Sequence, residues 1–130
     1  MPLPVVTFPD IVTALLPHLR TQIAGVTFAA SVPNPRPTGP LVTLRRAGGT
    51  DRVNGIYDRP RIDVQVWHSS EFSALALAAQ VRAHLLAAPG RVAGVSRAST
   101  FTGPIPIPDE SSDQPRVLLT VELQIKGAQS

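Results

Sequence analysis

The stretch that decides the fold is Arg116-Val117-Leu118-Leu119-Thr120-Val121-Glu122-Leu123-Gln124-Ile125-Lys126. Its odd-numbered residues are apolar, and most of the residues between them are polar. Apolar side chains at every second position are typical of a half-buried β-strand, because successive side chains of a strand point to opposite faces. We therefore expect a strand here, and its buried residues should be Val117, Leu119, Val121, Leu123 and Ile125.

Four stretches upstream are also expected to be strands, because they are rich in apolar residues and bounded by turn-forming residues. In Arg61–His68, apolar Ile62, Val64 and Val66 alternate with polar residues, and Trp67 falls on the polar side. The other three strands are expected at Val26–Val32, at Leu41–Arg46 and, with poorer alternation, at residues 92–102.

A first helix is expected to begin at Thr7 and to end at Gly25. Thr7 and Asp10 have the spacing of a capping box, in which two side chains bond the free amides of a helix start. Pro17 removes one backbone donor and should bend the helix on its solvent side. The apolar residues that recur at helical spacing are Ile11, Leu15, Leu19 and Ile23.

A second helix is expected directly after the strand Arg61–His68. Ser69 or Ser70 can cap its first turn, where Glu71 also suits the positive end of the helix dipole. It should end at Pro89-Gly90. Its expected buried stripe consists of Ala74, Leu77, Ala78, Val81 and Leu85.

The order is one helix, three strands, one helix and two strands, joined by connections that favour antiparallel pairing. The sequence therefore predicts an α+β fold: a mainly antiparallel β-sheet with two α-helices packed on one face, plus a projecting loop or hairpin arm. At 130 residues, the chain is long enough for one domain with its own core, spanning residues 1–130.

The expected arm is the span from Ala47 to Pro60. It is long for a hairpin turn, and its glycine, asparagine and aspartate residues favour turns and positive φ angles. It also carries four residues that a purely solvated loop would not need, which makes them candidate contact residues: Arg52, Ile56, Tyr57 and Arg59.

If both helices cover one face of the sheet, the opposite face is left uncovered. Its residues should be Thr43, Arg45, Arg61, Asp63, Gln65, Trp67, Leu118, Thr120, Glu122 and Gln124. This face is either an ordinary solvated surface or a surface that builds an assembly. Trp67 and Leu118 favour an assembly, because large apolar groups gathered on a surface tend to mark contacts. We include Arg45 with them as a candidate interface residue.

The composition limits the classes of function. The chain has no cysteine, which excludes disulfides, zinc–thiolate sites and cysteine nucleophiles. No apolar run reaches the roughly 20 residues of a membrane span, and the first residues lack the pattern of a secretion signal. The net charge of +3 leaves a nucleic-acid-binding domain open, but the arginines are scattered rather than interleaved with aromatic residues.

No catalytic, cofactor or metal site is expected. The three histidines, His18, His68 and His84, are not spaced as paired ligands. Asp109–Asp113 offers oxygens at alternate positions as calcium loops do, but Gln114 and Thr120 stand where such a loop needs glycine and glutamate. We interpret this segment as a solvated acidic loop and expect the protein not to be an enzyme.

Three segments together carry a resemblance to a known family. The first is Ser31-Val32-Pro33-Asn34-Pro35-Arg36-Pro37, which leads into the strand at Leu41. The second is Arg59–Trp67, and the third is Ile107-Pro108-Asp109 followed by Gln114-Pro115-Arg116. Over roughly Pro9 to Gly127, the chain resembles the tail terminator proteins of long-tailed bacteriophages, especially those of actinobacteria. It departs from that pattern at Val117-Leu118, where an aromatic residue is expected.

The resemblance implies a structural virion protein at the head-proximal end of the tail, present in the host cytoplasm during assembly. Such proteins form a ring, typically a hexamer, that ends polymerisation of the tail tube and offers a surface for head attachment. The implied partners are further copies of the chain, the major tail tube protein and a head-completion or connector protein. DNA would pass through the ring without specific binding. The alternatives are a head–tail connector or neck protein and, in a different class, a small enzyme or nucleic-acid-binding domain.

Overall fold

The computed structural model describes residues 5–53 and 56–129, without the side chains of residues 50–53 and 128–129. Within these residues it has two helices and a five-stranded sheet, so the predicted α+β class is confirmed. In chain order, the elements are β1 (Val6–Thr7), α1 (Ile11–Gln22), β2 (Thr27–Ala29), β3 (Leu41–Val53), β4 (Tyr57–Trp67), α2 (Glu71–Leu86), β5 (Val95–Pro106), β6 (Arg116–Lys126) and β7 (Ala128–Gln129).

The main sheet has the strand order β2-β3-β4-β6-β5. All neighbouring strands pair antiparallel except β2 and β3, which are parallel. The prediction of antiparallel pairing is therefore wrong for β2 and β3. The reason is the connection through residues 30–40, which returns the chain to the end of the sheet where β2 began. Parallel neighbours need such a crossover, whereas antiparallel neighbours can be joined by a tight turn.

Helix α1 begins at Ile11, and the predicted start at Thr7 is wrong. Asp10 is the N-cap: its Oδ1 accepts a hydrogen bond from the Val12 amide and its Oδ2 one from the Thr13 hydroxyl. Thr7 instead belongs to β1, which pairs with β7 near the other end of the chain. Thr7 is therefore in a strand because it pairs with Ala128, which lies 121 positions further along the chain.

Helix α2 agrees with its prediction. Ser70 is the N-cap and accepts a hydrogen bond from the Ser73 amide at 3.1 Å. The expected stripe on this helix is buried in full. The helix ends at Leu86, shortly before Pro89-Gly90.

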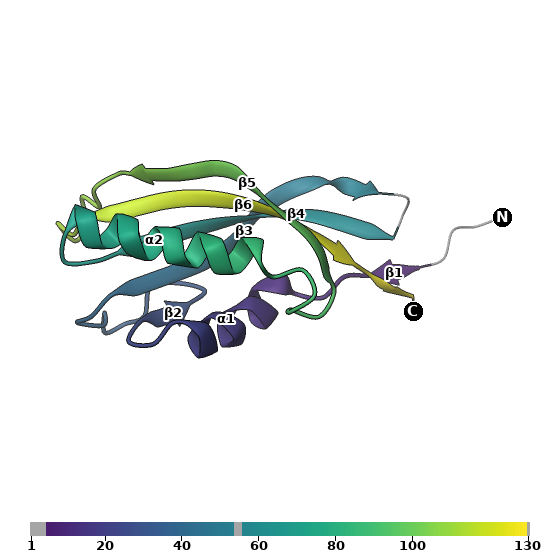
Figure 1. Ribbon diagram of the computed structural model, residues 1–130, viewed down its shortest axis with the longest axis horizontal. Coiled ribbons are helices and arrows are strands. Elements are labelled where there is room, and N and C mark those ends of the chain that lie inside the picture. Colours follow the sequence, from purple (N-terminus) through teal and green to yellow (C-terminus); the bar gives the residue numbers. More distant parts are fainter. Residues whose placement is uncertain (1–4, 54–55, 130) are drawn as a thin grey trace.

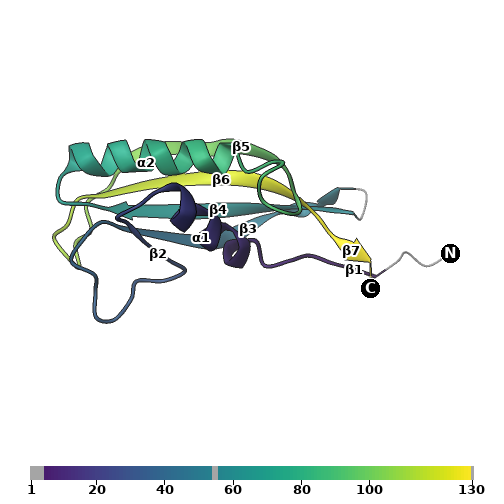
Figure 2. The same cartoon turned by 60° about the horizontal axis from the view of Figure 1, so that its bottom comes forward.

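Both helices pack on one face of the sheet, as Figures 1 and 2 show, with α2 beside β5 and β6 and α1 beside β2. The core forms between the two layers, and on β6 it contains all five apolar residues predicted to point inward. From β3 and β4 it takes Val42, Leu44, Ile62, Val64 and Val66. From α1 it takes Ile11, Val12, Leu15 and Leu19.

Four strands have bounds that differ from the expected ones. β2 is shorter than Val26–Val32, because the proline-rich segment that follows it cannot continue a ladder of hydrogen bonds. β3 and β4 are longer, since they continue into the arm. β5 reaches Pro106, so the connection to β6 is limited to residues 107–115.

The small sheet of β1 and β7 was not predicted, and it places both ends of the described chain at the same end of the molecule as the arm (Figure 1). Gly127 lies directly before β7, where a Cβ atom would overlap the Val6 and Phe8 side chains. In the described part of the chain, neither helix has the length and apolar character to cross a membrane.

Candidate interaction surface

The arm is a β-hairpin that extends β3 and β4 beyond the helices (Figure 1). Its strands pair at Gly49 with Pro60, at Thr50 with Arg59 and at Val53 with Tyr57, with register shifts between these pairs. Of the two forms that the sequence allowed, the hairpin is therefore confirmed. Pairing through the backbone gives the arm a defined direction, which a loop of the same length would lack.

An ion pair fixes the base of the arm. Arg46 donates two hydrogen bonds to Asp58, from Nη1 to Oδ2 at 2.7 Å and from Nη2 to Oδ1 at 3.1 Å. Asp58 is only 7% exposed. A bidentate arginine–carboxylate pair is directional as well as strong. It therefore holds β3 and β4 in one geometry where they leave the core.

The four candidate residues of the arm have different positions. Ile56 is 44% exposed, and its carbonyl accepts a hydrogen bond from the Gly127 amide. Tyr57 and Arg59 are half-buried at the start of β4. Arg52 lies in β3, but its side chain is outside the described part of the structure. Exposed Ile56 remains the clearest apolar contact candidate on this hairpin.

The face of the sheet opposite the helices is uncovered over most of its length, as expected, but Thr43, which was expected there, is only 5% exposed. Arg45 is exposed on β3, and Leu118 is half-buried on β6. The cross-strand register places Asp63 beside Arg45, and Glu122 beside Arg61. We call this surface the open face. It consists of the residues of β3, β4, β6 and β5 that point away from the helices. It begins at Arg45 on β3, Gln65 on β4, Leu118 on β6 and Ile105 on β5, and it extends to the arm.

Trp67 is not on the open face, and its assignment to an exposed interface is wrong. It is 3% exposed, and it lies outside the main core together with Leu41, its partner across β3 and β4. Residues 30–40 and 107–115 cover it at this end of the sheet. The guanidinium of Arg36 lies over its ring at 5.1 Å, and its Nε1 donates a hydrogen bond to Asp109 at 2.7 Å.

Asp109 is the centre of a buried polar cluster and is not a solvated residue, so that expectation is wrong for this position. It is 7% exposed and also accepts hydrogen bonds from the Ser111 amide and from the Ser111 and Ser112 hydroxyls. The bonds from the Ser111 and Ser112 hydroxyls, followed by that from Trp67, hold the pKa of Asp109 well below its usual range. These bonds outweigh the opposite effect of burial.

This cluster unites the three segments that carry the family resemblance. Arg36 comes from the proline-rich segment, Trp67 from the end of β4, and Asp109 and Gln114 from the last connection. Arg36 donates from Nε to Gln114 Oε1 at 3.0 Å, and its Nη2 lies 3.7 Å from Asp109 Oδ2. The segments are therefore linked by packing and hydrogen bonding. Their meeting gives them a structural role in closing one end of the sheet.

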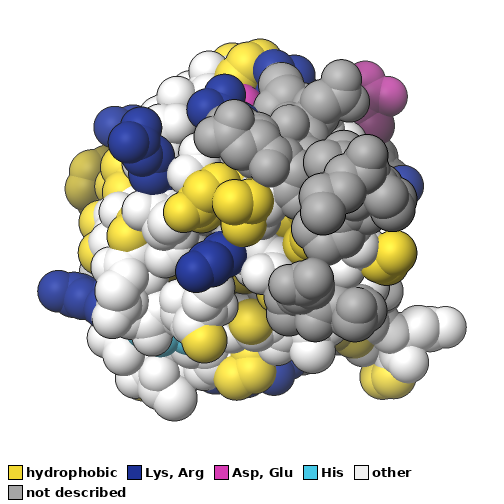
Figure 3. All heavy atoms as spheres, turned by 90° about the vertical axis from the view of Figure 1, so that its right-hand side faces the viewer, with side chains coloured by type: hydrophobic (Ala, Val, Ile, Leu, Met, Phe, Trp, Pro, Cys, Tyr) yellow, Lys and Arg dark blue, Asp and Glu magenta, His cyan; other side chains and the backbone are white. Residues whose placement is uncertain are grey.

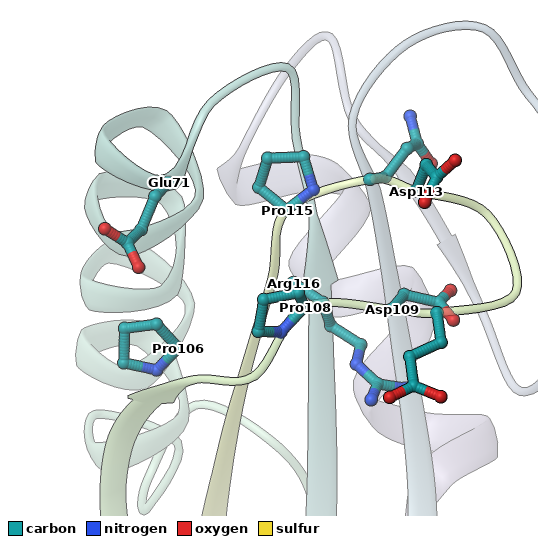
Figure 4. A pocket seen from close by; sticks show the side chains of 9 residues that line it. Glu71, Pro106, Pro108, Asp109, Asp113, Pro115 and Arg116 are labelled. Atoms are coloured by element: carbon teal, nitrogen blue, oxygen red, sulfur yellow. The ribbon is translucent and has the colours of Figure 1, made fainter.

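The segment Asp109–Asp113 does not form a cation site in the described residues. The Asp109 oxygens accept bonds from within the loop and from Trp67, while Glu110 and Asp113 are exposed. Figure 4 shows that prolines stand between Glu71 of α2 and the aspartates of the loop around a hollow of about 310 Å³. No described group of three His, Asp or Glu side chains has a metal-binding arrangement.

The open face has a groove of about 280 Å³ between β4, β6 and the last part of β5. Its lining includes three apolar side chains that are not buried in the core, and two of them, Ile105 and Ile107, are 45% and 41% exposed. Leu118 is the third and lies opposite Ile105 in the ladder. Nearby, Phe101 is 53% exposed, with the Arg61 guanidinium 3.8 Å above its ring.

Phe101, Ile105 and Ile107 were not among the candidates from sequence. The segment Ile105-Pro106-Ile107-Pro108 held the signal that could have identified them. Isoleucine that alternates with proline cannot form the interior of a central strand, because proline cannot donate to the ladder. Such isoleucines therefore belong at an edge, and exposed ones there indicate a contact.

Basic residues predominate where the open face meets the arm. Arg59, Arg97 and Lys126 lie there on neighbouring strands, and none makes an ion pair with a described side chain. Figure 3 looks at this end of the molecule and shows several groups of Lys and Arg side chains and few acidic ones on its described part. The surface is therefore suited to an acidic partner.

No family model matches the chain, and no curated protein is significantly similar to it.

Proposed function

We propose that this protein is a structural component of a phage tail, which forms a ring on the last ring of the tail tube and ends its polymerisation. The observation that carries the proposal is the one-sided architecture. Two helices cover one face of the sheet, while the open face keeps an apolar groove and the hairpin arm extends beyond the core. Large apolar groups gathered on a surface are typical of a protein that works in contact with others.

The sequence resemblance supports the same proposal, since it covers most of the chain. Its three motifs form the buried cluster of Trp67, Asp109 and Arg36, which closes the end of the sheet away from the arm.

The proposed mechanism requires no bond to be made or broken. Copies of the chain associate into a ring, typically a hexamer in the family, and the ring binds the last tube ring through surfaces that match it. The opposite side of the ring offers no site for another tube subunit, so growth stops, and it accepts the head-completion protein. The arm reaches beyond the core and is suited to contact a neighbouring subunit or the tube.

A second candidate is a head–tail connector or neck protein, which would use the same architecture at an adjacent position. The basic end of the open face is the observation that favours this candidate, because a connector also lines the path of the DNA. A role in specific DNA recognition has less support, since the arginines are scattered along the sequence rather than interleaved with aromatic residues.

Electron microscopy of particles with and without the protein tests the proposal. If the gene is deleted from the phage, tails of variable and excessive length that lack heads are expected. Addition of the purified protein to growing tubes should restore defined lengths, and negative staining should show a ring at one tube end. Tails of normal length that lack only the connection to the head would instead support the connector. Normal, infectious particles without the protein would exclude both.

A further inference from the structure

The groove on the open face owes its shape to irregularities in β5. The register between β5 and β6 shifts between Thr100 and Thr102 and again between Thr102 and Ile105. Each shift inserts an extra residue that bends the strand, and Pro104 and Pro106 lack an amide to donate. These features disfavour the addition of another strand at this edge. The occupant of the groove is therefore expected to be a side chain.

The charges around the groove disfavour pairing of this face with itself. Three arginines, Arg45, Arg61 and Arg116, lie around it, against two carboxylates: Asp63, beside Arg45, and Glu122, which lies 3.6 Å from Arg61 Nε. Two copies that met face to face would bring these arginines together. A complementary partner would instead present an apolar side chain with an acidic residue beside it.

The chain carries such a pair on its opposite side. Phe72, in the first turn of α2, is 84% exposed, the highest value among the exposed large apolar side chains that the structure describes. Glu71 precedes it in the sequence, is also exposed, and lines the neighbouring hollow with Pro106 and Arg116 (Figure 4). It forms no ion pair with a described side chain. Because α2 lies on the covered side of the sheet, Phe72 cannot reach the groove of its own molecule.

We propose that copies of this chain associate head to tail, with Phe72 of one copy in the open-face groove of the next and its Glu71 beside the basic rim. An aromatic side chain in a pocket is a common anchor of protein interfaces. Because this contact joins two different surfaces, a row of associated copies keeps an unused groove at one end and an unused Phe72 at the other. Repetition with the right rotation closes a ring, so this inference rests on the proposed function and names the surfaces that would build it.

Site-specific cross-linking tests the contact. Because the sequence has no native cysteine, only the introduced cysteines can react. A protein with Ala76→Cys, one helical turn after Phe72, and Thr102→Cys, at the groove, keeps both Phe72 and Ile105. Treated with a short bismaleimide, it is expected to form a ladder of covalent multimers, both in solution and on assembled tails. A matched control joins Thr102→Cys with Val32→Cys, since Val32 is also exposed, at 41%, but lies in the proline-rich segment. The control is expected to give at least tenfold less product.

Mixing of variants tests the direction of the contact. Phe72→Asp removes the anchor and Ile105→Asp closes the groove, and both residues are exposed enough for the fold to remain. Each variant alone should lose ring formation, with association at least tenfold weaker. A mixture should give heterodimers and nothing larger, because only one of the two possible contacts is intact in each pair.

Other outcomes would overturn the proposal. If both aspartate variants formed rings like the unmodified protein, or if the cysteine pair cross-linked no better than its control, the contact would be wrong while ring formation stood. If the unmodified protein formed no ring either in solution or on tails, the proposed function itself would fail. If duplex DNA, rather than assembly, protected the groove cysteine from modification, the open face would be a nucleic-acid surface.

Discussion

At the scale of single residues, Asp109 links several segments at one end of the sheet. Its carboxylate joins the end of β4 to the last connection, and it lies 3.7 Å from Arg36 Nη2 of the proline-rich segment. A buried acceptor with several donors strongly favours its charged form. The closed end of the sheet therefore depends on the ionised carboxylate.

The first prediction concerns the pH dependence of this contribution. The folded-state pKa of Asp109 is lowered below the unfolded value of about 3.9, so its stabilisation is present above that pH and is lost as the pH falls below it. Asp109→Asn should lower the free energy of unfolding at neutral pH by about 1–3 kcal/mol. The difference should shrink below about pH 4. Urea unfolding at several pH values measures this, and a difference independent of pH would contradict it.

The second prediction concerns Gly49 in the arm. Its φ is +143°, and a Cβ atom there would overlap the carbonyl oxygen of Arg59 across the hairpin. Gly49→Ala should therefore open the arm at a cost of about 1 kcal/mol or more. Hydrogen exchange should become faster in β3 and β4 of the arm. Gly39→Ala is the control, since its Cβ would meet no described atom within 4 Å. Equal protection in both variants would contradict the clash.

At the scale of elements, β6 joins the core to the open face. Its odd-numbered side chains are buried under the helices, while its even-numbered ones lie on the open face, including the groove residue Leu118. One strand thus contributes to stability through one face and to the candidate contact through the other.

The third prediction uses this division. Val121→Asp should prevent folding, because an unpaired charge in the core costs several kcal/mol against a total stability of about 5–15 kcal/mol. Leu118→Asp makes a similar change on the other face and should leave a folded protein that no longer forms a ring. Circular dichroism melts distinguish the two. A cooperative melt of the Val121→Asp variant would refute the assignment of the buried face.

The fourth prediction concerns the arm as a unit. We expect it to contact a neighbouring subunit or the last tube ring. Replacement of Thr50–Ile56 by a short glycine bridge removes no core residue, so the domain should still fold. It removes the pairing of Thr50 with Arg59 and of Val53 with Tyr57, and the bond from the Gly127 amide to Ile56. Tails assembled with this variant should be overlong or fail to join heads. Tails of normal length that accept heads would exclude the arm as the working contact.

At the scale of the whole molecule, the two ends differ. The end with the arm also holds both ends of the described chain and the unpaired basic side chains (Figures 1 and 3). The other end is closed by two loops and carries the exposed carboxylates of Glu71, Glu110 and Asp113. A molecule with opposite charges at its ends is suited to directional association, and less to symmetric pairing.

The fifth prediction concerns copy number. If one ring caps each tail, each tail should contain the number of copies that make up one ring. This number is six at the stoichiometry that is usual in the family. Quantitative mass spectrometry of purified tails, calibrated against the major tail tube protein, measures this number. One or two copies per tail would contradict the ring, and a number that grows with tail length would indicate a tube component instead.

The candidate site was only partly predictable. Arg45 and Leu118 lie on the open face as the alternation of their strands indicated, whereas Trp67 has the same alternation and is buried. The difference comes from two distant loops that fold over Trp67. The groove was missed because it depends on bulges in β5, which have no period to recognise.

The sequence alone determined the features whose cause is local. The two-residue period of Arg116–Lys126 and the buried stripe of α2 follow from where each side chain points along a strand or a helix. Only the tertiary structure decided features that need a distant partner: the parallel pairing of β2, the start of α1 at Ile11 and the burial of Asp109. A short segment can satisfy its hydrogen bonds in several ways, and the contacts that select one come from residues far along the chain.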